Sequence, residues 1–324
     1  MEARALGRSG ISVSRIVLGC GNFGGVGSAP AFFGQGIPHE EALRIMDAAW
    51  DLGITTFDTA DAYGGGRSET WIGEWLAAKG PEVRAGITIE TKTFNPMAEG
   101  ADRGLSRHRI RRQVETSLRR LRLERIPLYT AHDFDSDTPA EETLSAFDEL
   151  VRAGKVGAVG ASNFTAEQLA EAVEISELEG LTRYEWVQNS FSLLERDDAE
   201  TVFPVCHEHE LGYEAFGPLA GGWLAGRYRR GETYPDGSRM ATRPEGYRRY
   251  ESDAMFDALE AFEREARDRD ASMAGLALAW LLGVPELTAV VVGPTRAEHL
   301  EPVREALSLE LTSEKHSHLR GLFA

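Results

Sequence analysis

The sequence predicts an α/β protein, a single (β/α)8 TIM barrel over residues 1–324 with an N-terminal β-hairpin. Eight short β-prone runs alternate with helical patterns, which is the order of a barrel rather than of two domains. Several runs are apolar throughout, as in residues 156–160, and such runs are typical of parallel strands buried on both faces. No linker rich in Pro, Gly or Ser divides the chain.

Each element follows from a local pattern. Two extended segments flank the turn-rich cluster at residues 7–10, which predicts the hairpin. Helix starts are expected where Pro139 follows the capping residue Thr138, and again at residues 163–167. We expect the barrel strands at residues 15–20, 54–58, 87–92, 126–132, 156–161, 185–189, 211–216 and 287–292. The clearest helical patterns cover residues 39–52, 107–122, 139–153, 165–178, 253–269 and 296–308.

Two long segments interrupt this alternation. Residues 21–38 contain many Gly and Pro, and residues 221–252 mix Gly, Arg and Tyr. Long loops in a compact domain are usually functional. Because both follow strands, we expect both to overhang the rim at which the strands end.

Composition narrows the classes of function. The chain has 35 basic and 52 acidic residues, a net charge of −17, which argues against nucleic acid or an anionic membrane as a partner. Residues 273–292 are largely apolar, but Pro285 interrupts them, so we expect a core helix and a strand rather than a membrane span. Two cysteines cannot form a disulfide framework, and Met1–Arg4 lacks the apolar core of a signal peptide. We therefore expect a cytoplasmic protein, which could form a homo-oligomer.

Four polar residues lie at or just after the ends of consecutive predicted strands: Asp58, Tyr63, Lys92 and His132. All strand ends of a barrel face one rim, so these side chains are expected to converge there. An ammonium at Lys92, held charged by Asp58, would lower the pKa of Tyr63 and make it a general acid towards a carbonyl. His132 could donate a hydrogen bond to the same oxygen. The four residues predict carbonyl reduction, or the reverse oxidation.

Plainer interpretations exist for each residue alone, because a strand-end Lys or Asp is often an ion pair and a loop Tyr often only packs. A second catalytic interpretation makes Lys92 a Schiff-base nucleophile in an aldolase-like barrel, which the Asp58 partner disfavours. No metal site is expected. The histidine pairs 207/209 and 316/318 lie in helical patterns, where residues two apart do not share a face.

The chain resembles the aldo-keto reductases over nearly its full length. The matching segments, in order, are residues 57–64 (Phe-Asp-Thr-Ala-Asp-Ala-Tyr-Gly), 91–92, 128–132, 160–164, 188–194 and 216–222. The resemblance implies a single barrel that binds NADP(H) extended across the rim, without a Rossmann domain. It also implies a catalytic tetrad of Asp58, Tyr63, Lys92 and His132, with Tyr63 as the proton donor and a small carbonyl compound as the substrate.

The same resemblance assigns cofactor contacts to individual residues. Ser162, Asn163 and Gln188 match the positions that hold the nicotinamide carboxamide, and Phe216 matches the aromatic residue that stacks on the ring. The loop that follows the pyrophosphate corresponds to Gly217, Pro218, Leu219, Ala220 and Gly221, and Gly21 and Asn22 are expected beneath the nicotinamide. Arg227 and Arg239 match phosphate-facing positions, although both could be solvated loop charges.

The segment that would hold the adenosine 2′-phosphate includes Gly293, Thr295, Arg296 and His299. His299 stands where Gln or Arg is common in the family, and Arg296 could bind the phosphate instead. NAD(H) is therefore not excluded as the cofactor. Because the chain ends soon after its last helix, Phe32, Phe33, Trp223 and Tyr228 are the expected apolar pocket walls, which would favour hydrophobic or aromatic aldehydes and ketones.

Two other interpretations were weighed. Residues 19–24 fit the Gly-x-Gly-x-x-Gly pattern, but a Rossmann fingerprint needs a helix at once and an acid about 20 residues later, and neither follows. A regulatory subunit that binds NADP(H) without turnover could be built on the same fold, because a fold does not fix a function.

Overall fold

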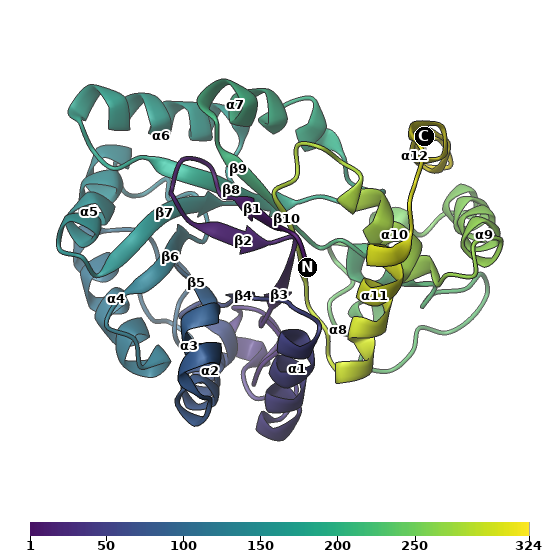
Figure 1. The fold of residues 1–324 in the computed structure, drawn as a ribbon, viewed down its shortest axis with the longest axis horizontal. Helices are drawn as coiled ribbons and strands as arrows, with labels where there is room; N and C mark the ends of the chain where they lie inside the picture. Colours follow the sequence, from purple (N-terminus) through teal and green to yellow (C-terminus); the bar gives the residue numbers. More distant parts are fainter. Residues whose placement is uncertain (324) are drawn as a thin grey trace.

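The computed structural model describes residues 1–323. Eight parallel strands form a closed barrel in the order β10-β3-β4-β5-β6-β7-β8-β9, with helices around it (Figure 1), which confirms the predicted fold. The barrel strands are β3 (Ile16–Gly19), β4 (Thr56–Asp58), β5 (Thr88–Thr93), β6 (Ile126–Ala131), β7 (Val156–Ser162), β8 (Tyr184–Ser190), β9 (Gly212–Phe216) and β10 (Ala289–Val292). Each overlaps a predicted strand and shares its position in the order.

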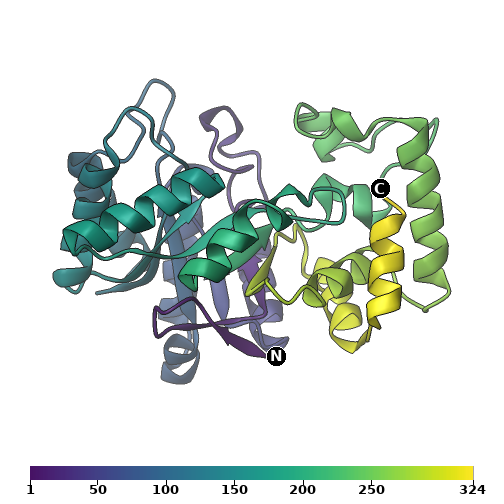
Figure 2. The same cartoon turned by 90° about the horizontal axis from the view of Figure 1, so that it is seen from above.

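The hairpin is formed by β1 (Ala3–Ala5) and β2 (Ser12–Ser14), which pair antiparallel. Leu6 and Val13, in and beside these strands, pack with Val17, Leu128 and Trp186 in an apolar cluster inside the barrel. The hairpin therefore closes one mouth of the barrel, and Figure 2 shows it on the side opposite the long loops.

The helices of the outer layer fall at or between the predicted ranges. They are α1 (His39–Asp51), α2 (Arg67–Ala78), α3 (Pro81–Gly86), α4 (Arg107–Leu121), α5 (Ala140–Arg152), α6 (Ala166–Glu179), α7 (Val202–His209), α8 (Arg239–Thr242), α9 (Asp253–Arg267), α10 (Met273–Leu282), α11 (Glu301–Ser308) and α12 (Ser313–Gly321). The helix start expected at residues 163–167 is confirmed, and Thr165 and Gln168 form a reciprocal capping box at the start of α6. The expected cap at Thr138 is wrong by one residue, because α5 begins at Ala140 with Pro139 in the cap position.

The apolar segment 273–292 divides as expected into α10 and β10, both buried. Among residues 1–323, no helix is long and apolar enough to cross a membrane.

Both long loops lie at the mouth opposite the hairpin and contact each other. Arg239 Nη2 donates to Asn22 Oδ1 at 3.1 Å, and the Arg243 guanidinium lies over the Phe32 ring, 5.0 Å from its centroid. The first loop also lies against the turn that carries Tyr63. A Cβ on Gly64 would come within 2.5 Å of the Phe23 carbonyl oxygen, so only glycine fits there, and its φ of +59° is also one that glycine tolerates best.

Candidate active site

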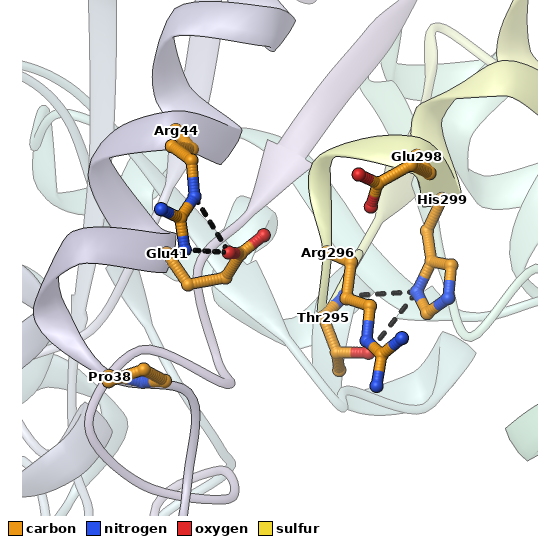
Figure 3. A pocket seen from close by; sticks show the side chains of 7 residues that line it. All are labelled: Pro38, Glu41, Arg44, Thr295, Arg296, Glu298 and His299. Carbon is orange, nitrogen blue, oxygen red and sulfur yellow. Dashed lines mark hydrogen bonds and ion pairs between the residues drawn. The ribbon is translucent and has the colours of Figure 1, made fainter.

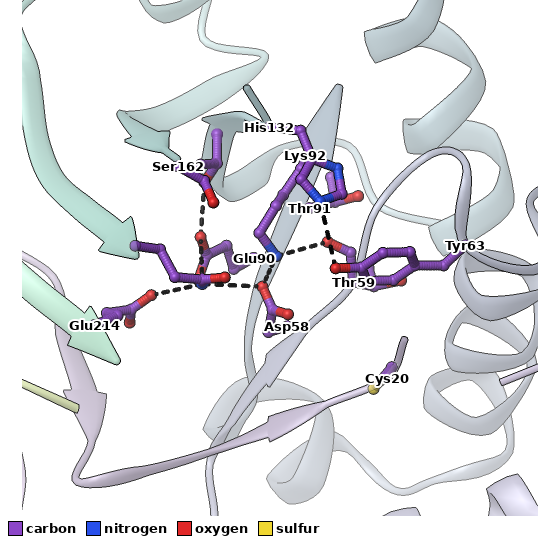
Figure 4. Close-up of polar contacts among 12 residues, drawn as sticks. Cys20, Asp58, Thr59, Tyr63, Glu90, Thr91, Lys92, His132, Ser162 and Glu214 are labelled. Atoms are coloured by element: carbon purple, nitrogen blue, oxygen red, sulfur yellow. Dashed lines mark hydrogen bonds and ion pairs between the residues drawn. The ribbon is translucent and has the colours of Figure 1, made fainter. Parts of the chain in front are cut away.

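The four strand-end residues meet at the open mouth of the barrel, as the sequence predicts (Figure 4). Lys92 Nζ forms an ion pair with Asp58 Oδ1 and also donates to the Thr59 carbonyl at 3.3 Å. The Lys92 side chain is fully buried and that of Asp58 is 4% exposed. Lys92 Nζ lies 5.6 Å from the centre of the Tyr63 ring, so a protonated lysine faces the phenol.

Tyr63 and His132 face each other across the site. The phenol oxygen lies 3.5 Å from His132 Nε2, and the two rings are nearly perpendicular, at 80°. The backbone N–H of His132 donates to the Thr93 carbonyl at 3.0 Å, which fixes this residue to the end of β5. A carbonyl oxygen placed between the phenol and the imidazole could accept a hydrogen bond from each.

The protonation states follow from burial. Burial, reinforced by the charge of Glu90, raises the pKa of Tyr63. Our expectation that Lys92 lowers the pKa of Tyr63 is wrong for the protein alone, because desolvation of the phenolate outweighs the ammonium's attraction. The pKa of His132 is lowered well below its usual value by burial and by Lys92, so the imidazole is neutral. Burial also lowers the pKa of Lys92, while the carboxylate of Glu214 acts in the opposite direction.

Two further acids lie in the barrel interior below the ion pair. Glu90 (β5) and Glu214 (β9) are both fully buried. Gln188 Nε2 donates to Glu214 Oε2 at 3.0 Å, to Asp58 Oδ1 at 3.2 Å and to both oxygens of Glu90 at 3.4 Å. Sequence reasoning missed these acids. The signal was present, because each lies two residues before an assigned site residue on the same strand, Lys92 or Phe216, and so faces the same way.

The residues assigned to the carboxamide cluster where β7 and β8 end. Ser162 is buried and Asn163 is exposed at the rim with a φ of +60°. Asn163 Nδ2 donates to the His132 carbonyl at 2.9 Å and to Ser162 Oγ at 3.1 Å, which connects this pair to His132. The three residues assigned to the carboxamide, which include Gln188, therefore lie beside the four strand-end residues.

The assigned pyrophosphate loop follows β9 directly. Gly217, Ala220 and Gly221 all have positive φ, so the chain turns tightly after Phe216. Tyr247 packs against Gly221, where a Cβ would come within 2.5 Å of its ring. Pro218 and Leu219 complete this turn.

A cavity of about 590 Å³ lies at the far end of the site, between α1 and the turn after β10 (Figure 3). One side carries Pro38, Glu41 and Arg44, and the other carries Thr295, Arg296, Glu298 and His299. Thr295 Oγ1 lies 3.1 Å from His299 Nδ1. Burial and the nearby charges of Arg296 and Arg227 lower the pKa of His299, so Arg227 also approaches this cavity.

Arg239 and Gly293 connect the two ends of the site. Arg239 donates to Asn22, whose Nδ2 in turn donates to the Gly293 carbonyl at 3.3 Å. Gly21, next to Asn22, lies against Tyr63, since a Cβ there would be 3.6 Å from the Tyr63 ring. The structure therefore brings the assigned residues together along one continuous path from Tyr63 to His299.

The chain matches the model of the aldo/keto reductase family over residues 15–323. It belongs to this family. It is 36% identical to an uncharacterized oxidoreductase, YrpG, of Bacillus subtilis, with 100% of this chain and 96% of that protein covered. It is 33% identical to the L-glyceraldehyde 3-phosphate reductase of Escherichia coli O157:H7, over 95% and 88% of the two chains. It is 29% identical to a probable voltage-gated potassium channel subunit beta of Arabidopsis thaliana, with 95% of this chain and 92% of that protein covered.

The expected pocket walls of this aldo/keto reductase divide into two groups. Trp223 and Tyr228 are fully buried and pack against each other, with ring centres 5.0 Å apart, and Tyr228 donates to the Gly221 carbonyl. They support the loop from inside, so our expectation that they line the substrate pocket is not supported. Phe32 and Phe33 are half-buried in the first loop, and Phe33 lies beside Gly65 next to Tyr63.

The histidine pairs and the two cysteines are the remaining side chains that the sequence offers as reactive or metal-binding groups. The histidine pairs fall in α7 and α12, as the helical patterns indicate. Across residues 1–323, no group of three or more His, Cys, Asp or Glu side chains is arranged to hold a metal ion. Both cysteines are buried free thiols, and burial raises the pKa of each.

Proposed function

We propose that this aldo/keto reductase interconverts aldehydes or ketones and alcohols with NADP(H), and that Tyr63 transfers the proton. The observation that carries the proposal is the Tyr63 hydroxyl, 3.5 Å from a neutral His132 and facing the Lys92–Asp58 ion pair. These groups leave one place where a carbonyl oxygen could meet two hydrogen-bond donors.

The residues present fit a nicotinamide dinucleotide. Neutral amide and hydroxyl groups of Ser162, Asn163 and Gln188 lie at the end nearest the tyrosine, where an uncharged carboxamide would bind. At the other end, no carboxylate among residues 1–323 forms an ion pair with Arg227, Arg239 or Arg296. Unpaired guanidinium groups on a chain of net charge −17 support the binding of phosphates there.

The chemistry divides between cofactor and protein. A bound reduced nicotinamide supplies the two electrons and the hydrogen that reduce the carbonyl carbon. Tyr63 keeps its proton until the carbonyl oxygen gains negative charge, and then donates it. Lys92 stabilises the resulting phenolate, and Asp58 keeps Lys92 charged in a site that otherwise favours neutral groups. His132, neutral because of its burial, orients the oxygen.

The end of the site that carries Arg227, Arg239 and Arg296 is called the arginine end, and the opposite end, at Tyr63, the tyrosine end. The cavity at the arginine end favours NADP(H) over NAD(H). Arg296 and His299 lie on one wall, and Arg44 lies on the other. Glu41 and Glu298 also line the cavity, but the Glu41 carboxylate is held by hydrogen bonds from Arg44 and from the Ala297 N–H. A guanidinium suits a 2′-phosphate better than a ribose hydroxyl.

Phe32 and Phe33 support a preference for hydrophobic or aromatic carbonyl compounds, because both lie in the loop that packs against the Tyr63 turn. The test of substrate class is the relative kcat/KM for benzaldehyde derivatives, short aliphatic aldehydes and small sugars. Equal values for aromatic aldehydes and sugars would contradict this preference.

The test of the function is NADPH oxidation, followed at 340 nm, by the purified protein with that panel. We expect turnover with at least one aldehyde. Tight NADPH binding without turnover on any substrate would instead favour a regulatory subunit that binds the cofactor; one relative is named a probable voltage-gated potassium channel subunit beta. Trapping of a substrate on Lys92 by borohydride would favour the Schiff-base mechanism.

A further inference from the structure

Three carboxyl groups surround a single amide nitrogen in the barrel interior. Gln188 Nε2 lies 3.0 Å from Glu214, 3.2 Å from Asp58 and 3.4 Å from Glu90. An amide nitrogen has only two hydrogens to donate. In Figure 4 the two glutamates and Asp58 lie on the side of the site away from Tyr63.

The charges in this group do not balance. Asp58, Glu90 and Glu214 could contribute three negative charges, and among residues 1–323 Lys92 is the one basic side chain that forms an ion pair with any of them. All four side chains are buried, and a buried charge without a compensating partner is strongly unfavourable. At least one proton must therefore remain on the carboxyl groups at neutral pH.

Hydrogen bonds indicate where this proton lies. Glu90 Oε1 accepts from Thr130 Oγ1 at 2.7 Å and from Trp186 Nε1 at 3.2 Å, whereas Oε2 has only the long contact of 3.4 Å to Gln188 Nε2, so Oε2 is the oxygen better placed to carry the proton. Glu214 Oε1 is buried and has no hydrogen-bond partner. The neighbouring Glu214 carboxyl and burial both raise the pKa of Glu90 well above its usual value. A proton on Glu90 Oε2 would give Glu214 the donor that it lacks.

The same acids determine which way Gln188 points. If its amide were turned over, the oxygen would lie against the ionised carboxylate oxygens of Asp58 and Glu214, which repel it. The nitrogen therefore faces the acids, and the amide oxygen faces away from them. A nicotinamide carboxamide offers N–H donors to such an oxygen.

We propose that Glu90 and Glu214 are positioning residues that share one proton and hold the Gln188 amide with its oxygen towards the nicotinamide. The shared proton is a property of the protein without a bound nucleotide. The orientation of Gln188 towards the nicotinamide rests on the proposed function.

The first test detects the proton directly. Infrared spectra at pH 8 should show a protonated carboxylic acid that is absent from Glu90→Gln and from Glu90→Gln/Glu214→Gln. Glu177→Gln, which alters an exposed glutamate on α6, should keep the band. Identical bands in the wild type and in Glu90→Gln, with both proteins folded, would overturn the shared proton. If the double variant does not fold, Glu90→Gln alone decides.

The second test measures the orientation of Gln188 by binding. The 3-acetylpyridine analogue of NADPH lacks the carboxamide N–H, and fluorescence titration gives its Kd and that of NADPH. The wild type should prefer NADPH by about 2- to 10-fold, the equivalent of one hydrogen bond. In Glu90→Gln/Glu214→Gln that preference should become smaller, because glutamine can donate as well as accept and lets Gln188 turn over.

The outcomes separate the two proposals. An unchanged NADPH preference in the double variant would overturn the positioning role. If the wild type bound neither nucleotide, the proposed function and the nicotinamide-facing part would fail together, while the infrared test would still decide whether Glu90 and Glu214 share a proton.

Discussion

Side chains at the tyrosine end of the site belong to barrel strands or lie at their ends and are mostly buried, whereas those at the arginine end come from turns and are mostly exposed. Lys92, Glu90 and Glu214 are inaccessible to solvent, and Arg227, Arg296 and His299 are exposed. Burial strengthens the interactions between charges at the tyrosine end, while water screens those at the arginine end. The first end should tolerate few substitutions, and the second should adjust affinity in small steps.

The largest expected effect is at the ion pair. Asp58→Asn removes the one carboxylate that forms an ion pair with the buried Lys92, and we expect the free energy of unfolding to fall by about 3–5 kcal/mol. Denaturant unfolding measures this loss. The matched control, Lys92→Met/Asp58→Leu, should recover most of the stability without recovering turnover. A loss below about 1 kcal/mol in Asp58→Asn would mean that the Lys92–Asp58 ion pair contributes little to stability.

A smaller effect tests the packing beneath the tyrosine end. A Cβ on Gly160 would come within 2.2 Å of the Trp186 indole, which itself donates to Glu90. Gly160→Ala should therefore lower the free energy of unfolding by about 1–3 kcal/mol. Gly246→Ala, where a Cβ meets nothing within 4 Å, serves as the control in the same thermal or denaturant measurement. Equal stability of the two variants would show that the interior is not tightly packed.

At the arginine end, Arg296→Ser should weaken NADPH binding relative to NADH by about 3- to 10-fold, because an exposed guanidinium contributes a screened contact to phosphate. Titration at two salt concentrations measures both the change and its screening. Arg304→Ser, on α11 and paired with Glu301, should leave the ratio unchanged. A loss that is independent of salt would contradict the contrast between the two ends.

The pH dependence of stability tests one further group at the tyrosine end. The pKa of His132 is lowered in the folded protein, so below about pH 6.5 the unfolded chain binds more protons and stability falls. His132→Gln should reduce this slope by up to about 1.4 kcal/mol per pH unit. The same change at the exposed His108 should leave the slope as it is in the wild type. Equal slopes for the two variants would mean that His132 can be protonated in the folded state.

The strand-built end was also the more predictable from sequence. Asp58, Lys92 and His132 close β-prone runs, and parallel strand ends must meet at one rim, so their convergence followed from the fold. Glu90 was missed because a single acid within a β-prone run does not by itself indicate a functional site. Its partner Glu214 is 124 positions away in sequence, and only the register of the closed barrel brings the two together.

The loop-built end could be predicted only by resemblance. Arg296 and His299 matched family positions, but nothing in their local pattern indicated that Arg44 of α1 lies on the opposite wall. Trp223 and Tyr228 were misplaced because aromatic residues in a glycine-rich loop fit either a pocket wall or a buried support. The tight turns at Gly221 and Gly222, which place Trp223 inside, depend on packing that spacing does not reveal.

The most direct test is a comparison of Tyr63→Phe with the wild type, with kcat for carbonyl reduction and Kd for NADPH measured on the same preparations. Removing the hydroxyl removes the proton donor and leaves the ring, so kcat should fall by at least about 100-fold while Kd stays nearly constant. Turnover by Tyr63→Phe at close to the wild-type rate would contradict the assignment of Tyr63 as the acid.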